Sequence, residues 1–366
     1  MTAVSTRGRA RSLLSRVARL AERATTPLLP ADYLDLFDPL RSGADLRGRI
    51  VAVEPETRDA VTVTIRPGRG WAGHVPGQYV RVGVDVDGVR LWRAYSVTSR
   101  TDRPDGCLTI TVKAIPDGVV SNHLVRHASV GTVIQLDQAT GEFVLSPTRP
   151  ARALFVTAGS GITPVMGILR NAIDELTDVV LLHSAPTRDD VIFGAELRAM
   201  AADGRLTLIE RHTDVDGMVA VDELADLVPD FAERLTWVCG PTGMLDALEA
   251  HWESHGATDR ITTERFRATV VVAGDGGAVT FTRTGTTVDA DGATPILDAA
   301  ENAGVLMPSG CRMGICYGCV LPMREGAVRD LRTGEITTAT AHESGSGGVP
   351  IQTCISAAAG ACDIDH

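Results

Sequence analysis

SGCRMGICYGC, residues 309–319, is the stretch that most strongly constrains how this chain folds. Its cysteines, Cys311, Cys316 and Cys319, are spaced C-x4-C-x2-C, and Cys354 follows after a gap of 34 residues. Five of the seven cysteines lie within the last 56 residues. Because the first residues do not resemble a secretory signal, we interpret this concentration of thiols as metal ligands rather than as disulfides.

Two kinds of metal site take four thiolates. Zinc sites favour paired C-x2-C units, and no second pair follows Cys319. The spacing is instead that of plant-type [2Fe–2S] clusters, for which one tight loop supplies three ligands and a separate segment supplies the fourth. Three glycines allow the loop backbone to turn inward and direct N–H groups at sulfur, namely Gly310, Gly314 and Gly318.

The segment around this loop resembles plant-type ferredoxins, which carry one electron at a time. The resemblance includes a strand pair and a helix before the loop and a final strand after Cys354. It implies a β-grasp-like C-terminal domain in which Cys311, Cys316, Cys319 and Cys354 hold the cluster. We expect Cys362, in an alternating apolar run near the end of the chain, to be a small buried residue rather than a ligand.

Composition narrows the class of protein further. A chain of 366 residues provides two or three domains, and its net charge of −11 disfavours a nucleic-acid binder. The sequence contains no run of about 18 apolar residues, which is what a membrane-spanning helix would need, so we expect a cytoplasmic protein. Residues 1–26 carry six arginines against the single acid Glu22. This segment is either an amphipathic element that contacts anionic lipid at the inner face of the membrane, or a solvated terminus.

The periodicity of the sequence changes along the chain. From Arg47 to a last run at Glu142–Leu145, short apolar runs alternate with period two, which predicts an antiparallel barrel. After Ala151, strands alternate with helices, which predicts a parallel sheet, and the run AGDGGA at 273–278 is typical of a flexible linker. We therefore expect a multidomain α/β protein with a basic extension (1–46), a barrel (47–148), a parallel α/β domain (149–272), and a linker with a cysteine-rich domain (273–366).

The barrel contains the run Arg93-Ala94-Tyr95-Ser96-Val97-Thr98-Ser99. The pattern R-x-Y-S-x-x-S resembles the flavin motif of the ferredoxin–NADP reductase superfamily, although an ordinary alternating strand is the alternative. The resemblance implies that Arg93 pairs with a cofactor phosphate, Tyr95 stacks on the flavin ring and Ser96 places its hydroxyl near flavin N5. It also assigns two further cofactor-binding positions, Val97 and Ser99.

A second element of the barrel, Gly118-Val119-Val120-Ser121-Asn122-His123-Leu124, resembles the G-x-x-S-x-x-L element of the same superfamily. There a turn and a helix N-terminus offer N–H groups to a diphosphate. The resemblance implies cofactor contacts from Gly118, Val120 and Ser121. A diphosphate favours FAD over FMN, although related three-domain reductases use FMN.

Two loops of the second domain indicate a nicotinamide cofactor. Ala158-Gly159-Ser160-Gly161-Ile162-Thr163-Pro164 follows a strand and opens a helix, and it resembles the G-x-G-x-x-P loop of the superfamily. Cys239-Gly240-Pro241 resembles its C-G-P turn. The resemblance implies cofactor contacts from Gly159, Gly161, Thr163, Gly240 and Pro241. It also places Cys239 beside the reacting carbons, although an inert buried thiol is the alternative.

The preference between NADPH and NADH is weakly encoded. Ser184 and Arg188 lie at the end of the second strand of this domain and could bind the 2′-phosphate of NADPH. The neighbouring acidic residues Asp189 and Asp190 weaken that interpretation. Phe266 ends the domain in the segment Glu264-Arg265-Phe266. In similar reductases such an aromatic residue returns to the flavin, so Phe266 either shields the ring until nicotinamide displaces it or packs between domains.

The order of the three signals implies an oxidoreductase that passes electrons from NAD(P)H through FAD to a [2Fe–2S] cluster and on to a partner protein. The layout resembles actinobacterial NADPH-dependent reductases that serve membrane-bound acyl-CoA (fatty acid) desaturases. The alternative partner is a soluble oxygenase acting on aromatic, phenylacetyl-CoA or steroid substrates. A redox sensor without enzymatic turnover is a third hypothesis.

Overall fold

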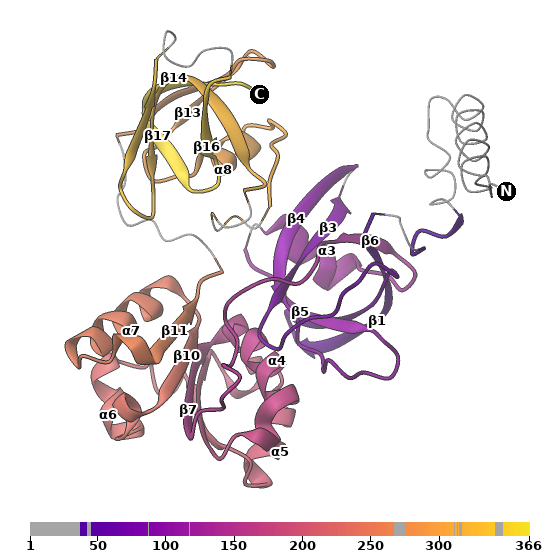
Figure 1. Cartoon of the computed structure of the whole chain (residues 1–366), viewed down its shortest axis with the longest axis vertical. Helices are drawn as coiled ribbons and strands as arrows, with labels where there is room; N and C mark the ends of the chain where they lie inside the picture. Colours follow the sequence, from indigo (N-terminus) through magenta and orange to yellow (C-terminus); the bar gives the residue numbers. More distant parts are fainter. Residues whose placement is uncertain are drawn as a thin grey trace, which may run out of the picture.

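The computed structural model describes residues 37–41, 45–86, 88–116, 118–266, 275–310, 312, 314, 317–340 and 347–366. The predicted basic element at residues 1–26 and two predicted cluster ligands, Cys311 and Cys316, lie outside these residues. Figure 1 shows three bodies in chain order: a barrel, a layered α/β domain and a C-terminal sheet domain. Among the described residues, no helix is both long and apolar enough to cross a membrane.

The first body is the expected antiparallel barrel. Its strands run in the order β4-β3-β6-β1-β2-β5, and the bridge between Val97 and Ile110 joins the two ends of the sheet. Apolar side chains such as those of Val63 and Val82 are fully buried, and β2 is buried on both faces from Ala60 to Ile65. The elements are β1 (Arg47–Thr57), β2 (Ala60–Pro67), β3 (Tyr79–Val86), β4 (Val89–Ser96), β5 (Leu108–Lys113), α3 (Val119–His127) and β6 (Val133–Leu136).

The prediction of a strand at Glu142–Leu145 is wrong, because this segment has no regular secondary structure. Phe143 is buried in the apolar core of the second domain, and the indole N–H of Trp237 donates to the carbonyl of Val144 over 3.3 Å. The apolar side chains are therefore buried as expected, but they are buried against the neighbouring domain and not in the barrel sheet.

The second body is a five-stranded parallel sheet in the order β11-β10-β7-β8-β9. The chain first proceeds from β7 to one side and then returns to place β10 on the other, so the topological switch point lies between β7 and β10. The strands are β7 (Arg152–Ala158), β8 (Asp178–Ala185), β9 (Thr207–His212), β10 (Leu235–Cys239) and β11 (Ile261–Glu264), and the α-helices are α4 (Ile162–Ala172), α5 (Gly194–Ala202), α6 (Leu224–Leu227) and α7 (Thr242–Ser254).

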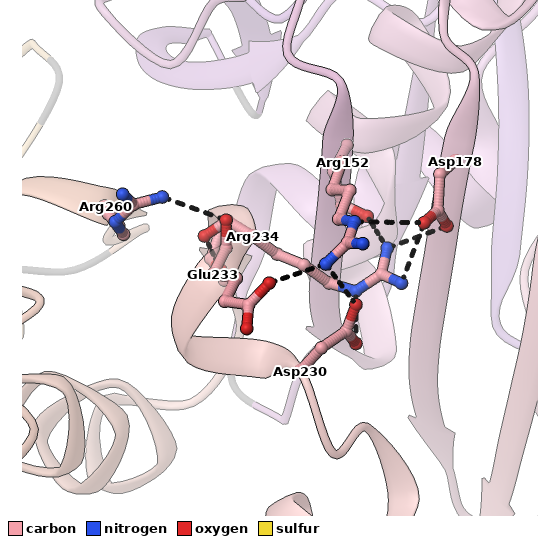
Figure 2. Close-up of polar contacts among 8 residues, drawn as sticks. Arg152, Asp178, Asp230, Glu233, Arg234 and Arg260 are labelled. Carbon is pink, nitrogen blue, oxygen red and sulfur yellow. Dashed lines mark hydrogen bonds and ion pairs between the residues drawn. The ribbon is translucent and has the colours of Figure 1, made fainter.

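A network of ion pairs covers the amino ends of these strands (Figure 2). The buried guanidinium of Arg234 donates to Asp178 over 2.9 Å and to Asp230 over 2.8 Å. Arg152 joins the network through Glu233 at 2.6 Å. These contacts place the charged residues at the end of the sheet opposite to the switch-point loops.

Helix α4 connects the second body to the barrel. A β-carbon on Gly167 would lie 2.4 Å from the carbonyl oxygen of Val97, so only glycine allows this approach. Arg170 donates to the carbonyl of Thr98 over 2.8 Å, and the side-chain amide of Asn171 donates to the carbonyl of Ser99 over 3.0 Å. One face of α4 is therefore bonded to the chain just after β4.

The third body is a mixed sheet in the order β13-β12-β17-β14-β15, with β16 paired to β14. Gly277 and Ala278 belong to β12, so the expected linker is shorter at this end than predicted. Cys362 is 2% exposed on β17, which confirms that it is a small buried residue. The elements are β12 (Gly277–Phe281), β13 (Thr286–Ala290), α8 (Ile296–Asn302), β14 (Val320–Asp330), β15 (Ile336–Ala339), β16 (Val349–Gln352) and β17 (Ser356–Ile364).

Candidate functional site

The end of β4 carries the first group of predicted site residues. Ser96 is 3% exposed, and its hydroxyl is buried without a hydrogen-bond partner among the described residues. A buried hydroxyl left unpaired is costly unless a bound group uses it. Tyr95 packs against the barrel core, and burial raises the pKa of its phenol, which stays neutral. These features fit a flavin at this strand end.

Arg93 precedes this pair on β4. Its guanidinium donates to the carbonyl of Trp92 over 2.7 Å. Burial and then the nearby charge of Arg312 lower the pKa of Arg93. Because an arginine stays protonated under such conditions, Arg93 offers a partly buried cation to an anionic group.

Val97 and Ser99 have structural contacts of their own. The N–H of Val97 donates to the carbonyl of Gln78 over 2.9 Å. The hydroxyl of Ser99 accepts from the N–H of Thr109 over 3.1 Å. Both residues thus hold the end of the barrel sheet, and their contact with a cofactor stays a prediction.

Gly118 is the N-cap residue of helix α3, which begins at Val119. A β-carbon there would lie 2.4 Å from the hydroxyl of Ser121, so a larger residue would have to displace this side chain. Ser121 donates to the carbonyl of Gly118 over 3.1 Å, and Val120 is buried. The first turn carries no acidic residue. The predicted diphosphate element therefore has a tight turn and an uncharged helix N-terminus, which suit an anion.

The two predicted nicotinamide loops meet at the switch point. Gly159 adopts a φ of 54°, in the left-handed region that favours glycine. A β-carbon on Gly161 would lie 2.0 Å from the carbonyl oxygen of Cys239. Gly240 packs near Ala158, and the hydroxyl of Thr163 donates to the carbonyl of Ser160 over 2.9 Å. Pro241 precedes α7 and is exposed. Ligands of open α/β sheets bind at this edge of the sheet.

Sequence reasoning placed Glu264 in the segment that ends this domain but gave it no role of its own. In the β10–β11 register Glu264 pairs with Cys239, so both side chains lie on one face of the sheet. Burial raises the pKa of Glu264 to about 8. Burial and the neighbouring Glu264 raise the pKa of the Cys239 thiol. At neutral pH the site therefore holds a neutral thiol beside a mostly protonated carboxyl group.

Phe266 follows this pair and is 40% exposed. It lies two residues after Glu264, on the segment that continues from β11 beside the end of β10. An exposed aromatic ring at this position is compatible with either predicted role, shielding a flavin or packing between domains. Its role stays a prediction.

The predicted 2′-phosphate residues lie at the carboxyl end of β8. Arg188 has a side chain 64% exposed, with a guanidinium nitrogen 3.8 Å from a carboxylate oxygen of Glu210. The β8–β9 register pairs Ser184 with Arg211, a second cation that sequence reasoning missed, because the strand pairing was needed to place it. Arg211 also pairs with Glu223. A hydroxyl and two guanidinium groups thus lie at or just after the carboxyl ends of two adjacent strands.

Two of the predicted cluster ligands can be placed. Cys319 and Cys354 are 1% and 3% exposed and belong to one small apolar cluster with Leu297 and Ile355. Between α8 and Cys319, three of the described residues have a positive φ: Arg312 (60°), Gly314 (75°) and Tyr317 (55°). The joint burial of two thiols in one apolar cluster fits the donor set of an iron–sulfur cluster.

The fold and the placement of these residues fit a flavin-dependent pyridine-nucleotide oxidoreductase with an appended iron–sulfur domain. Three family profiles match the chain: an oxidoreductase FAD-binding domain at residues 63–145, an oxidoreductase NAD-binding domain at 155–250 and a 2Fe-2S iron-sulfur cluster binding domain at 279–359. The chain belongs to the NAD(P)H oxidoreductases of ferredoxin reductase type that carry a C-terminal [2Fe–2S] domain.

Three proteins illustrate the similarity. An NADPH oxidoreductase of Mycobacterium tuberculosis is 49% identical over 356 residues, covering 95% of this chain and 91% of that protein. The ferredoxin reductase component of the 3-ketosteroid-9-alpha-monooxygenase of Mycolicibacterium smegmatis is 31% identical over 317 residues, covering 80% and 89%. The structure of phthalate dioxygenase reductase, 22% identical, matches with a TM-score of 0.60 over 87% of this chain and 97% of that one, and it supports the fold.

FAD, NAD(P)H and a [2Fe–2S] cluster are the cofactors of this chain. When bound, they supply the redox chemistry, in which a flavin exchanges hydride with nicotinamide and single electrons with the cluster. The described residues that could contact these cofactors include Ser96, whose hydroxyl has no partner among them, the neighbouring Cys239 and Glu264, and the buried thiols of Cys319 and Cys354.

Proposed function

We propose that this reductase takes its electrons from NADPH and delivers them to a membrane-bound acyl-CoA desaturase. The observation that carries the choice of partner is the charge distribution, with six arginines in residues 1–26 of a chain whose net charge is −11. A basic segment attracts the anionic surface of a membrane, where such a desaturase resides. The resemblance to actinobacterial reductases of desaturase systems supports the same partner.

NADPH is the proposed donor for two reasons. The relative that is 49% identical is an NADPH oxidoreductase. In this chain Ser184, Arg188 and Arg211 bring a hydroxyl and two cations to the ends of β8 and β9. Guanidinium groups recognise phosphate, whereas the unphosphorylated ribose of NADH offers them no anion.

Individual site residues have proposed roles as well. Arg93, Tyr95, Ser96, Gly118 and Ser121 would contact FAD. Gly159, Gly161, Thr163, Gly240 and Pro241 would contact the nicotinamide nucleotide, with Cys239 near the reacting carbon and Phe266 over the flavin. The four thiols of Cys311, Cys316, Cys319 and Cys354 would bind the cluster.

The second candidate partner is a soluble oxygenase. It is favoured by the similarity to a reductase component of a 3-ketosteroid monooxygenase, which is 31% identical over 80% of this chain. An oxygenase partner would need the same route from NADPH to the cluster, but it would not need the basic N-terminal segment.

One experiment separates the two partners. The purified holoenzyme is mixed with membranes that contain an acyl-CoA desaturase, and NADPH oxidation is followed with and without stearoyl-CoA. We expect oxidation that depends on both the membranes and the acyl-CoA, and that falls when the arginines of residues 1–26 are replaced by glutamine. Failure of acyl-CoA to stimulate oxidation, while the enzyme still reduces cytochrome c, would reject the desaturase and leave the oxygenase.

A further inference from the structure

A side chain of the barrel contacts the start of the cysteine loop. Arg81 on β3 donates from a guanidinium nitrogen to the carbonyl oxygen of Ser309 over 3.5 Å, across 228 residues of sequence. Ser309 lies two residues before the predicted ligand Cys311. Figure 1 shows the C-terminal domain beside the β3–β4 edge of the barrel, which is where this contact is made.

The guanidinium of Arg81 is held in place before it reaches Ser309. It pairs with the carboxylate of Asp137 over 3.0 Å, and it lies over the ring of Trp92, 5.1 Å from the centroid. Trp92 in turn packs on β3 at Gly83, where a β-carbon would lie 2.9 Å from the indole. The side chain of Arg81 is only 17% exposed. The carboxylate of Asp137 and the ring of Trp92 therefore hold it in place.

Arg81 also lies at the flavin motif. In the β3–β4 register it pairs with Ala94, the residue between Arg93 and Tyr95. A second observation places the two domains together here, since the charges of Arg312, Glu301 and Asp298 in the C-terminal domain act on Arg93. Arg81 thus lies beside the strand that carries the flavin motif and also bonds the start of the loop that carries the cysteines.

We propose that Arg81 is a positioning residue that docks the cysteine loop on the flavin barrel and so sets the separation between flavin and cluster. The step that depends on it moves one electron from the reduced flavin, which is oxidised, to the cluster, which is reduced. No atom is transferred, and two such transfers return the two electrons of one hydride. This inference concerns the electron path within the chain and is independent of the partner protein.

Two measurements on the cofactor-loaded enzyme test the proposal. Stopped-flow absorbance separates the reduction of flavin by NADPH from the later reduction of the cluster. Hydrogen exchange of the peptide around Ser309 reports docking without any turnover. For Arg81→Ala we expect an unchanged flavin phase, a cluster phase slower by about tenfold or more, and faster exchange around Ser309. Arg81→Lys keeps the charge toward Asp137 but has no planar second donor, so its cluster phase should be intermediate.

The matched control is Arg90→Ala. Arg90 belongs to the same hairpin and pairs with Asp85 over 2.8 Å at the surface. It should alter neither the cluster phase nor the exchange around Ser309. The proposal is overturned if Arg81→Ala leaves the cluster phase and the exchange at the control values. If Arg81→Ala lowers the melting temperature and cannot be loaded, Arg81→Lys decides, and equal rates in Arg81→Lys and the unmodified enzyme then reject the proposal.

Discussion

The backbone at Gly161 packs directly against the carbonyl oxygen of Cys239, and a β-carbon on Gly161 would lie only 2.0 Å from that oxygen. The loop after β7 and the turn after β10 therefore meet through a glycine, at the switch point of the sheet. An added methyl group must push one backbone segment aside, and the nucleotide contacts predicted for both loops would move with it.

We predict that Gly161→Ala weakens NADPH binding. Overpacking of this kind costs about 1–3 kcal/mol, which corresponds to an increase in Kd of roughly 5-fold to 150-fold. Titration of the oxidised enzyme with NADP⁺ measures this Kd. Gly243→Ala is the matched control, because nothing lies within 4 Å of a β-carbon at Gly243, on helix α7. Equal Kd values for the two variants would contradict the prediction.

Ser96 and Ser99 should respond differently to loss of their hydroxyl groups. Ser96→Ala removes a buried hydroxyl without a partner among the described residues, so it should not destabilise the apoprotein. It should slow flavin reduction by NADPH by about 100-fold. Ser99→Ala leaves the buried N–H of Thr109 without its acceptor and should cost about 1–3 kcal/mol of stability.

Urea unfolding of the apoproteins and stopped-flow reduction of the loaded enzymes measure the two effects. A Ser96→Ala enzyme that is reduced at the unmodified rate would argue against a role at flavin N5. A Ser99→Ala protein with normal stability but reduced flavin content would instead favour the cofactor contact predicted from the sequence.

Glu264 should make stability depend on pH. Its pKa is raised from 4.5 to about 8 by burial, so between these values the folded state retains a proton that the unfolded state has lost. The free energy of unfolding should therefore fall as pH rises from about 5 to about 8 and level off above that. Glu264→Gln should flatten this part of the curve. Urea midpoints measured across this range test it, and an identical slope in both proteins would disprove the assignment.

The Arg234 network should contribute to the stability of the second domain (Figure 2). Arg234→Met removes the buried cation that bonds Asp178 and Asp230, and these carboxylates are left with the longer contacts to Arg152, so the change should cost about 2 kcal/mol. Arg260→Ala removes one donor from the carbonyl of Glu233 at the surface and should cost less than about 1 kcal/mol. Thermal unfolding of both variants provides the comparison, and similar melting temperatures would show that the network adds little.

Removal of one predicted ligand should release the cluster. Cys354→Ser should lose iron and sulfide together with the visible absorption of the cluster, because three thiolates from one loop leave the fourth position open. Cys362→Ser is the control, since that thiol is buried on β17 in a different part of the core. It should keep its iron. Iron analysis of both proteins decides, and full iron content in Cys354→Ser would overturn the ligand assignment.

Local patterns were sufficient to predict much of the fold. Alternation predicted the barrel, and the strand–helix rhythm predicted the parallel sheet, because both periods are visible within a few residues. The segment at Glu142–Leu145 shows the limit of this reasoning. Its apolar alternation indicated burial, but it did not indicate that Phe143 would be buried in the next domain.

The site followed the same rule. Glycines and cysteines in short motifs were recognised, whereas relationships that depend on strand order were not. The pairing of Cys239 with Glu264 requires β10 and β11 to be neighbours, and that of Ser184 with Arg211 requires β8 and β9 to be adjacent. The contact between Arg81 and Ser309 joins two domains, and no local pattern predicts it.

Helix α4 has a consequence for the evolution of this chain. Its first turn follows the nucleotide loop, while Gly167, Arg170 and Asn171 contact the backbone of the last three residues of the flavin motif, 97–99. Insertion or deletion of one residue between these points would rotate one contact face against the other by about 100°. The number of residues in this helix is therefore constrained as tightly as their identity, so natural variants should differ here by substitution and not by length.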